Sequence, residues 1–158
     1  MRFHTSGTMH KFILADISCP DVSYGVMAGL QGRHWGGYLR IRSDFAKTPE
    51  TLYECLSDGS LTHGGIICTS GNVRNSNLYV TGGALMQISL YAGAGYGRRT
   101  LSWQDIEGNW ARVSDWSHKG LTIDAGMFLS WKYLAFSVGL STLSFKTYTF
   151  SIGIGLRL

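Results

Sequence analysis

The chain has 158 residues, enough for one domain or one moderately large barrel, and a net charge of +4. Charged residues make up only 15%, below the roughly 25% usual for soluble domains, while aromatic residues reach 13%. No apolar run approaches the roughly 18 residues of a membrane helix, which excludes a helical membrane protein. The basic residues are scattered without forming a basic helix or block, so we expect no nucleic-acid partner.

Large apolar residues alternate with small ones along most of the chain, and the helical period is absent, which predicts an all-β fold. Residues 1–10 form an N-terminal extension, and residues 11–158 form a barrel domain. The predicted strands are 11–18, 22–30, 36–45, 77–86, 89–104, 119–130, 133–141 and 145–158. The turn between the fourth and fifth strands falls at 87–88. Eight strands of this kind predict an antiparallel up-and-down barrel.

The connections between the strands are unequal in length. Two are long and polar, at 46–76 and 105–118, and the others are short turns. Antiparallel neighbours send successive connections to alternate ends, so both long segments lie at one end of the barrel. Long loops at one rim and short turns at the other are typical of an outer-membrane barrel.

The closing segment 145–158 shows which face of the barrel meets which environment. Its sequence, FKTYTFSIGIGLRL, alternates large apolar residues with Thr, Ser and Gly. A Gly/Ser/Thr exterior would lack the Lys and Glu that keep proteins soluble. We therefore place the small residues inside, where they leave room for larger polar groups, and the apolar residues against lipid. The polar groups predicted to pair across the lumen, as a structural seal, are Tyr38, Arg40, Arg42, Asp44 and Asp124.

Aromatic residues fall near the predicted strand ends. Trp35 and Trp131 lie at the short-turn rim, and Phe45, Trp103 and Phe145 lie near the long-loop rim. Two such belts are typical of the two membrane interfaces, and we assign these five residues to them.

Three stretches resemble small outer-membrane β-barrel proteins of Gram-negative bacteria: SYGVMAGLQGRHWGGYLRIRSDF at 23–45, LYAGAGYG at 90–97 and the closing YTFSIGIGLRL. They are similar to the superfamily of outer membrane protein A and X barrels, in particular to barrel domains of longer envelope proteins. The resemblance implies an eight-stranded transmembrane barrel in the outer membrane, both termini in the periplasm, and insertion by the barrel assembly machinery. Members usually close on an aromatic residue, whereas this chain closes on Leu158.

The first residues do not form a signal peptide, because their apolar stretch is about four residues rather than the 7–15 that a signal requires. Either the chain is cytosolic, or it is the mature or cropped portion of a longer precursor and export depends on sequence upstream of Met1.

Motifs for chemistry are weak. The segment AGAGYGRRT at 92–100 lacks the glycine and lysine positions of nucleotide-binding loops. Asp115, Ser117 and His118 suggest a hydrolytic set, but adjacent residues point to opposite faces of a strand. Asp105 and Glu107 sit with Asn109 and could bind a cation, although the calcium-loop pattern is absent. We therefore expect no catalytic residue, metal or other cofactor.

Cys55 and Cys68 lie in the same long polar segment. They form a disulfide if that segment faces an oxidising space, or they are free thiols, and the sequence leaves both open.

These features predict a non-enzymatic, monomeric outer-membrane barrel that acts as a membrane anchor or surface-display protein rather than a wide pore. Its partners would be membrane lipid and, through the loops at 46–76 and 105–118, an extracellular molecule. One alternative is a soluble lipocalin-like barrel that carries a small apolar ligand. A second alternative is a lipid-modifying outer-membrane enzyme.

Overall fold

The computed structural model describes residues 9–86 and 89–158, so most of the expected extension and the turn at 87–88 lie outside the described residues. In this part of the chain, no helix is long and apolar enough to cross a membrane. Its ten strands are β1 His10–Cys19, β2 Ser23–Gln31, β3 Trp35–Ser43, β4 Thr51–Cys55, β5 Thr69–Met86, β6 Leu90–Asp105, β7 Trp110–Val113, β8 His118–Trp131, β9 Leu134–Leu143 and β10 Thr147–Arg157.

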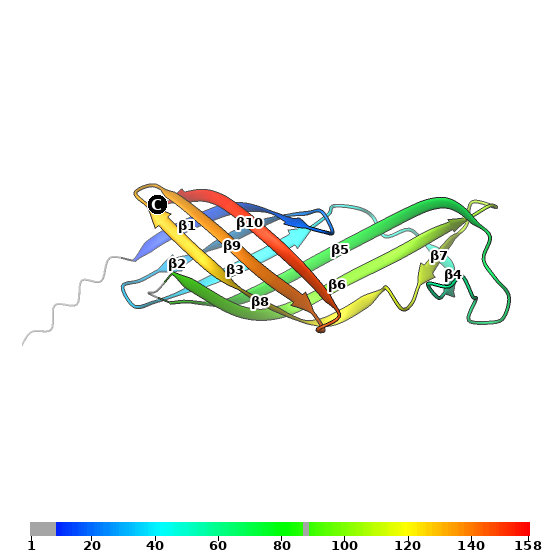
Figure 1. Ribbon diagram of the computed structural model, residues 1–158. Helices are drawn as coiled ribbons and strands as arrows, with labels where there is room; N and C mark the ends of the chain where they lie inside the picture. Colours follow the sequence, from blue (N-terminus) through cyan, green and yellow to red (C-terminus); the bar gives the residue numbers. More distant parts are fainter. Residues whose placement is uncertain (1–8, 87–88) are drawn as a thin grey trace, which may run out of the picture.

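Eight of the strands form a closed antiparallel barrel, which confirms the predicted fold class (Figure 1). The pairing of β1 with β10 joins the first and last of these strands, and the pairing of β6 with β8 completes the ring. At the chain end, Lys11 and Leu158 exchange both backbone hydrogen bonds, at 3.1 and 2.7 Å. The barrel therefore has no free edge over its common height, as a lipid environment requires.

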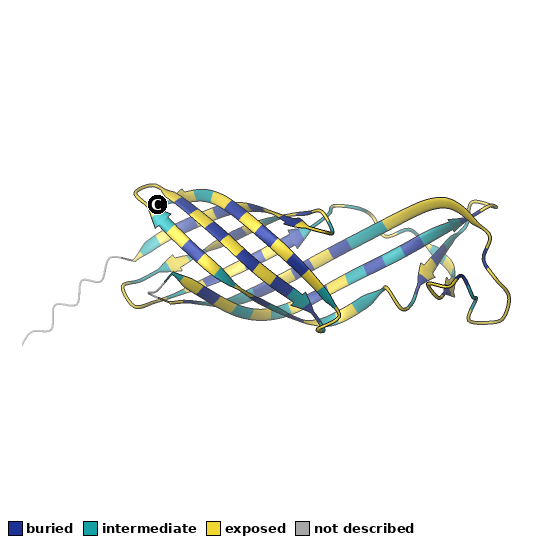
Figure 2. Ribbon diagram, in the orientation of Figure 1, coloured by how far each residue is buried: buried dark blue, intermediate teal, exposed yellow. Residues whose placement is uncertain are grey.

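Burial alternates residue by residue along the barrel strands, as the banding in Figure 2 shows. On β10, Ser151 is buried and Ile152 is 54% exposed. Successive side chains on a strand point to opposite faces, so this pattern puts the small residues inside and the apolar residues outside. The outside of the barrel is thus the apolar face, the opposite of a soluble protein.

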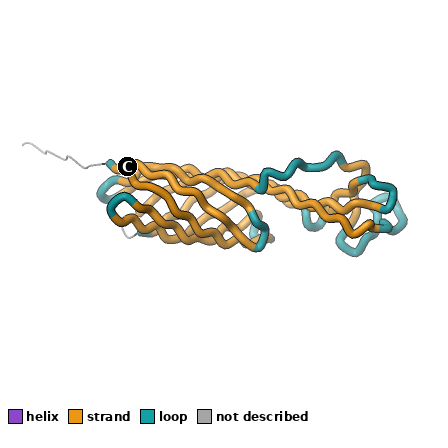
Figure 3. Tube along the Cα trace, turned by 90° about the horizontal axis from the view of Figure 1, so that it is seen from above, coloured by secondary structure: helices purple, strands orange, loops and turns teal. Residues whose placement is uncertain are grey.

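Both long polar segments lie at the end of the barrel away from the C-terminus, where β5 and β6 extend beyond the other strands (Figures 1 and 3). We call residues 46–76 and 101–117 the head. These segments were predicted as loops, but they contain β4, β7 and the first part of β5. Strand β7 pairs antiparallel with β6 and parallel with β4, so the head is a small sheet built on an extended hairpin.

The head has a hydrophobic core of its own. Cys55, Ala111 and Val113 are fully buried in it, with Ile67 beside them. Tyr53 and Trp103 pack against this cluster. A core separate from the barrel gives the head a defined shape where the sequence alone suggested irregular loops.

Candidate functional site

The barrel lumen holds a network of buried charges centred on Arg40 of β3. The Arg40 guanidinium lies 3.0 Å from the Asp16 carboxylate on β1 and 2.8 Å from that of Asp124 on β8. All three side chains are nearly inaccessible to solvent. A charge in such a place is tolerated only when it is paired and hydrogen-bonded, and here one cation joins three strands of the barrel wall.

Further polar side chains complete the network towards the head. Arg42 donates a hydrogen bond to Ser141 at 2.5 Å and lies over the ring of Tyr79, 5.5 Å from its centroid. Ser141 also donates to Asp124 at 3.1 Å. Nearer the C-terminal end of the barrel, Tyr91 accepts a bond of 3.1 Å from Arg40.

Apolar side chains fill the lumen between these charges and the end of the barrel with the short turns. The rings of Phe12 and Phe128 lie 4.6 Å apart, and Leu14, Met27 and Leu85 are buried beside them. At the end of the barrel that faces the head, Arg99 forms an ion pair of 2.9 Å with Asp21, which also accepts a hydrogen bond of 3.0 Å from Asn75. The lumen is therefore occupied by side chains at three successive levels.

Glycine makes this filling possible at two close approaches. A Cβ at Gly139 would lie 1.9 Å from the Tyr91 hydroxyl, and one at Gly93 would lie 2.5 Å from that of Tyr38. The small residues that alternate along the strands thus leave space for the large polar ones in a narrow barrel, as the sequence pattern predicts.

The structure brings four of the five predicted lumen residues together: Tyr38, Arg40, Arg42 and Asp124. It does not place Asp44 with them, and that assignment is wrong. Strand β3 ends at Ser43, and the Asp44 carboxylate instead accepts bonds from the backbone N–H groups of Ala46 and Asn77. Asp44 therefore caps the turn that leaves the barrel.

Sequence reasoning missed Asp16, the second carboxylate on Arg40. Its signal was present, because Asp16 is the one acidic residue in the predicted strand 11–18, KFILADIS, and shares the phase of Phe12 and Leu14. A lone acid on the inward face of an apolar strand predicts a buried cation as its partner.

The aromatic residues predicted at the interfaces divide into two groups. Trp35 and Trp131 are exposed at the end with the short turns, and Phe45 and Phe145 are exposed near the other rim, so their assignment to the two membrane interfaces stays a prediction. Trp103 differs, because β6 continues past the barrel and carries it into the core of the head.

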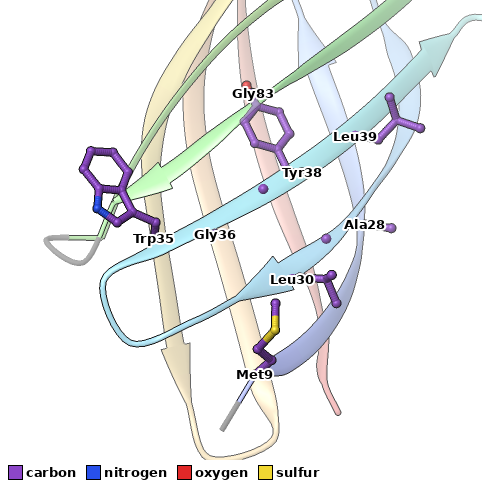
Figure 4. Close-up of a pocket in the computed structure, with 10 residues that line it drawn as sticks. Met9, Ala28, Leu30, Trp35, Gly36, Tyr38, Leu39 and Gly83 are labelled. Atoms are coloured by element: carbon purple, nitrogen blue, oxygen red, sulfur yellow. The ribbon is translucent and has the colours of Figure 1, made fainter. Parts of the chain in front are cut away.

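An apolar hollow of about 630 Å³ lies on the outside of β2 and β3, close to the short-turn end. Figure 4 shows it bordered by Leu30, Trp35 and Leu39. Gly37 presents no side chain between Trp35 and Leu39, which opens the hollow. Its apolar lining suits a lipid acyl chain and offers no group for chemistry.

The candidate hydrolytic set is not assembled as a relay. Ser117 bonds to the backbone of Leu101, and Asp115 accepts bonds from Ser57. These contacts hold the Ser117 hydroxyl and the Asp115 carboxylate within the head, and neither contact reaches His118.

The carboxylate of Asp105 organises the turn between β6 and β7 rather than leaving its oxygens free for a cation. It accepts bonds from Tyr53 and from the backbone N–H groups of Glu107 and Asn109. The Tyr53 hydrogen bond holds the pKa of Asp105 below its ordinary value. Burial, followed by this same bond, raises the pKa of Tyr53 to about 12.

Cys55 and Cys68 are both free thiols in the structure. Cys55 is buried in the core of the head, which raises the pKa of its thiol, and Cys68 is exposed.

No protein-family model matches the sequence, and a search of curated proteins finds no significant match. Among solved structures, this chain is similar to Ail, the attachment invasion locus protein of Yersinia pestis, as seen in its complex with the heparin analogue sucrose octasulfate. It has a TM-score of 0.58 and 14% identity, over 95% of this chain and 96% of that chain. A second Ail structure gives 0.57 and 13% over the same shares. Neisserial surface protein A aligns with a TM-score of 0.43 and 10% identity, over 95% and 94%.

The agreement with Ail covers nearly the whole of both chains at low sequence identity, so it concerns the fold. The closed ring of eight strands, the apolar exterior and the charged lumen agree with this likeness in fold. The chain has the fold of the small eight-stranded outer-membrane β-barrel proteins of Gram-negative bacteria.

Proposed function

We propose that the protein is a non-enzymatic, monomeric outer-membrane barrel that anchors the head and displays it at the cell surface. The observation that carries the proposal is the inverted burial: Arg40 and Asp124 are buried inside the barrel, and an apolar band faces outward. Such an exterior is stable against lipid and would aggregate in water. The head stands at one end, away from both described chain ends, which favours a periplasmic location for the chain ends and an external one for the head (Figure 1).

The arrangement argues against a soluble carrier of apolar ligands. Such a carrier needs an apolar lumen with free volume and a polar exterior. Here Arg40, Arg42 and Asp124 occupy the middle of the lumen, and residues such as Ile152 and Leu140 face outward. We propose that these charges seal the lumen, so that the barrel conducts no solutes, in accordance with its small strand number.

The arrangement also gives no support to a lipid-modifying enzyme. A serine hydrolase needs a base within hydrogen-bond reach of the nucleophile. The hydroxyl of Ser117 is instead engaged by the Leu101 backbone, and the Asp115 carboxylate by Ser57. We propose a binding role, in which the loops of the head meet an extracellular partner. The Ail complex with a heparin analogue makes an acidic saccharide the first ligand to test.

Membrane insertion is tested by extraction and gel migration. We expect the protein to leave membranes only with detergent and to migrate differently on gels before and after boiling. Monomeric solubility in plain buffer would overturn the proposal.

Orientation is tested with an epitope tag. Gly64 and Gly65 lie in an exposed turn of the head where an added atom at Gly64 meets nothing within 4 Å, so a tag between them is tolerated. A control tag goes into the opposite turn, between Lys132 and Tyr133. We expect antibody to label the first tag on intact cells and the second only after the outer membrane is permeabilised. The reverse pattern would place the head in the periplasm.

A further inference from the structure

Two cations face each other where the barrel meets the head. Arg98 on β6 and Lys119 on β8 are directly opposite in the strand register, and both side chains are exposed. Like charges in such a cross-strand pair destabilise a sheet. Among the described residues, no carboxylate forms a salt bridge with either one, and Arg98 donates only to the Thr100 hydroxyl, at 3.2 Å.

The two cations belong to a groove of about 410 Å³, which we call the rim groove. Arg99 and Arg112 also line the groove, but each is already paired with a carboxylate, Arg99 with Asp21 at 2.9 Å and Arg112 with Glu54 at 3.4 Å. The carboxylate of Asp115, on the same side of the barrel, accepts bonds from Ser57. Arg98 and Lys119 are thus the two cations of the groove that no described carboxylate balances.

The position of the rim groove indicates where a balancing anion comes from. The next outward-facing pair on the same two strands, on the barrel side, is Tyr96 and Leu121, which are 57% and 53% exposed. These belong to the apolar band. A basic groove directly above a lipid-facing tyrosine lies at the depth of lipid headgroups, and Arg and Lys both bind phosphate there.

We propose that the rim groove binds the phosphate groups of a phosphorylated saccharide lipid in the leaflet that surrounds the head. The anion bridges Arg98 and Lys119 and so removes the repulsion between them. This inference rests on the membrane location proposed above. A soluble phosphorylated or sulfated saccharide offers similar chemistry, but it would make no contact with the apolar residues beneath the groove.

The test uses the whole protein in phosphatidylcholine nanodiscs, with and without diphosphoryl lipid A, and measures the denaturant midpoint of unfolding. The variant R98Q/K119Q removes the pair. The control K11Q/R33Q removes two exposed cations at the opposite rim. In phosphatidylcholine alone, we expect R98Q/K119Q to be at least as stable as the unchanged protein, because the like-charge pair is gone. Lipid A should raise the midpoint of the unchanged protein and of the control, and leave that of R98Q/K119Q almost unchanged.

A titration with lipid A should show affinity roughly 25-fold weaker for R98Q/K119Q, since each of the two basic residues near an anionic surface contributes roughly a fivefold factor. An equal lipid A shift in R98Q/K119Q and the unchanged protein would overturn the inference. Sucrose octasulfate added to the phosphatidylcholine nanodiscs tests the soluble source, and a shift with it but none with lipid A would overturn the assignment to lipid. Failure to enter nanodiscs would overturn the membrane location as well, whereas insertion without a lipid A effect overturns this inference alone.

Discussion

The guanidinium of Arg40 on β3 lies 2.8 Å from the carboxylate of Asp124 on β8, and both side chains are closed off from solvent. Because Asp16 and Arg42 lie beside them, the four charges balance. Removing one carboxylate would leave an unpaired cation in the middle of the barrel. The cost of breaking a buried pair in this way is about 3 kcal/mol or more.

We therefore expect D124N to lower the free energy of unfolding by about 3 kcal/mol, measured by urea titration in detergent micelles. D44N is a suitable control, because Asp44 lies outside the lumen and an amide oxygen preserves part of its capping role. It should cost about 1 kcal/mol. If D124N proves as stable as D44N, the lumen charges are not coupled as the structure indicates.

The contact between Gly139 and Tyr91 gives a second prediction. A methyl group at Gly139 would overlap the Tyr91 hydroxyl, so we expect G139A to destabilise the barrel by roughly 1–3 kcal/mol. The same change should cost less in a Y91F background, because the overlapping oxygen is gone; Y91F alone is the reference, since it also loses the bond from Arg40. Both are measured by the same urea titration.

The control for this pair is G37A. Gly37 faces the lipid side, where an added Cβ meets only a backbone oxygen at 3.7 Å. G37A should therefore leave the urea midpoint nearly unchanged. Equal midpoints for G139A and G37A would contradict the close approach at Tyr91.

The barrel could be predicted from the sequence because every barrel strand alternates between residues that face lipid and residues that face the lumen. A residue such as Ile152 must face lipid while its neighbour Gly153 faces a narrow lumen, and this alternation is visible in the letters alone. Outside the barrel the alternation fails. Residues 69–74 of β5 are exposed on both faces, so nothing forces them to alternate, and the predicted strand began at Asn77 instead of Thr69.

The wrong site assignments have the same origin. Asp44 was placed in the lumen by extending the phase of Arg40 and Arg42, but the strand ends at Ser43 and Phe45 adopts a positive φ of 56°. Trp103 was placed at the membrane because a strand end was expected at Gln104, although β6 had already left the barrel. Strand phase predicts a residue's face, whereas its depth depends on pairing partners that the sequence does not show.

The hydrogen bond from Tyr53 to Asp105 gives a prediction about pH. The pKa of Asp105 is lowered in the folded head, so its contribution to stability is present above the ordinary carboxyl pKa and is lost as the pH falls through the lowered value. We expect the β6–β7 turn to loosen below about pH 4. Hydrogen exchange of peptides covering 100–113, corrected for the intrinsic effect of pH, measures this directly.

The variant D105N provides the comparison. It should exchange faster than the unchanged protein at pH 7 and show a smaller additional change in acid, because the carboxylate that titrates is absent. Asp58 and Asp115 also have lowered pKa values through bonds from Ser60 and Ser57, so part of the acid effect will remain. An unchanged acid response in D105N would show that Asp105 does not contribute to it.

The two cysteines of the head differ in a way that labelling can detect. The thiolate is the reactive form, and Cys55 is buried with a raised thiol pKa, whereas Cys68 is exposed. In a C19S background, we expect a maleimide at pH 7 to modify Cys68 quickly in the folded protein and Cys55 only after denaturation. The variant C68S should then take up no label while folded. If neither cysteine reacts until a reductant is added, even in denaturant, the two are joined in a disulfide. The head would then have to move Cys55 out of the core that it forms with Ala111 and Val113.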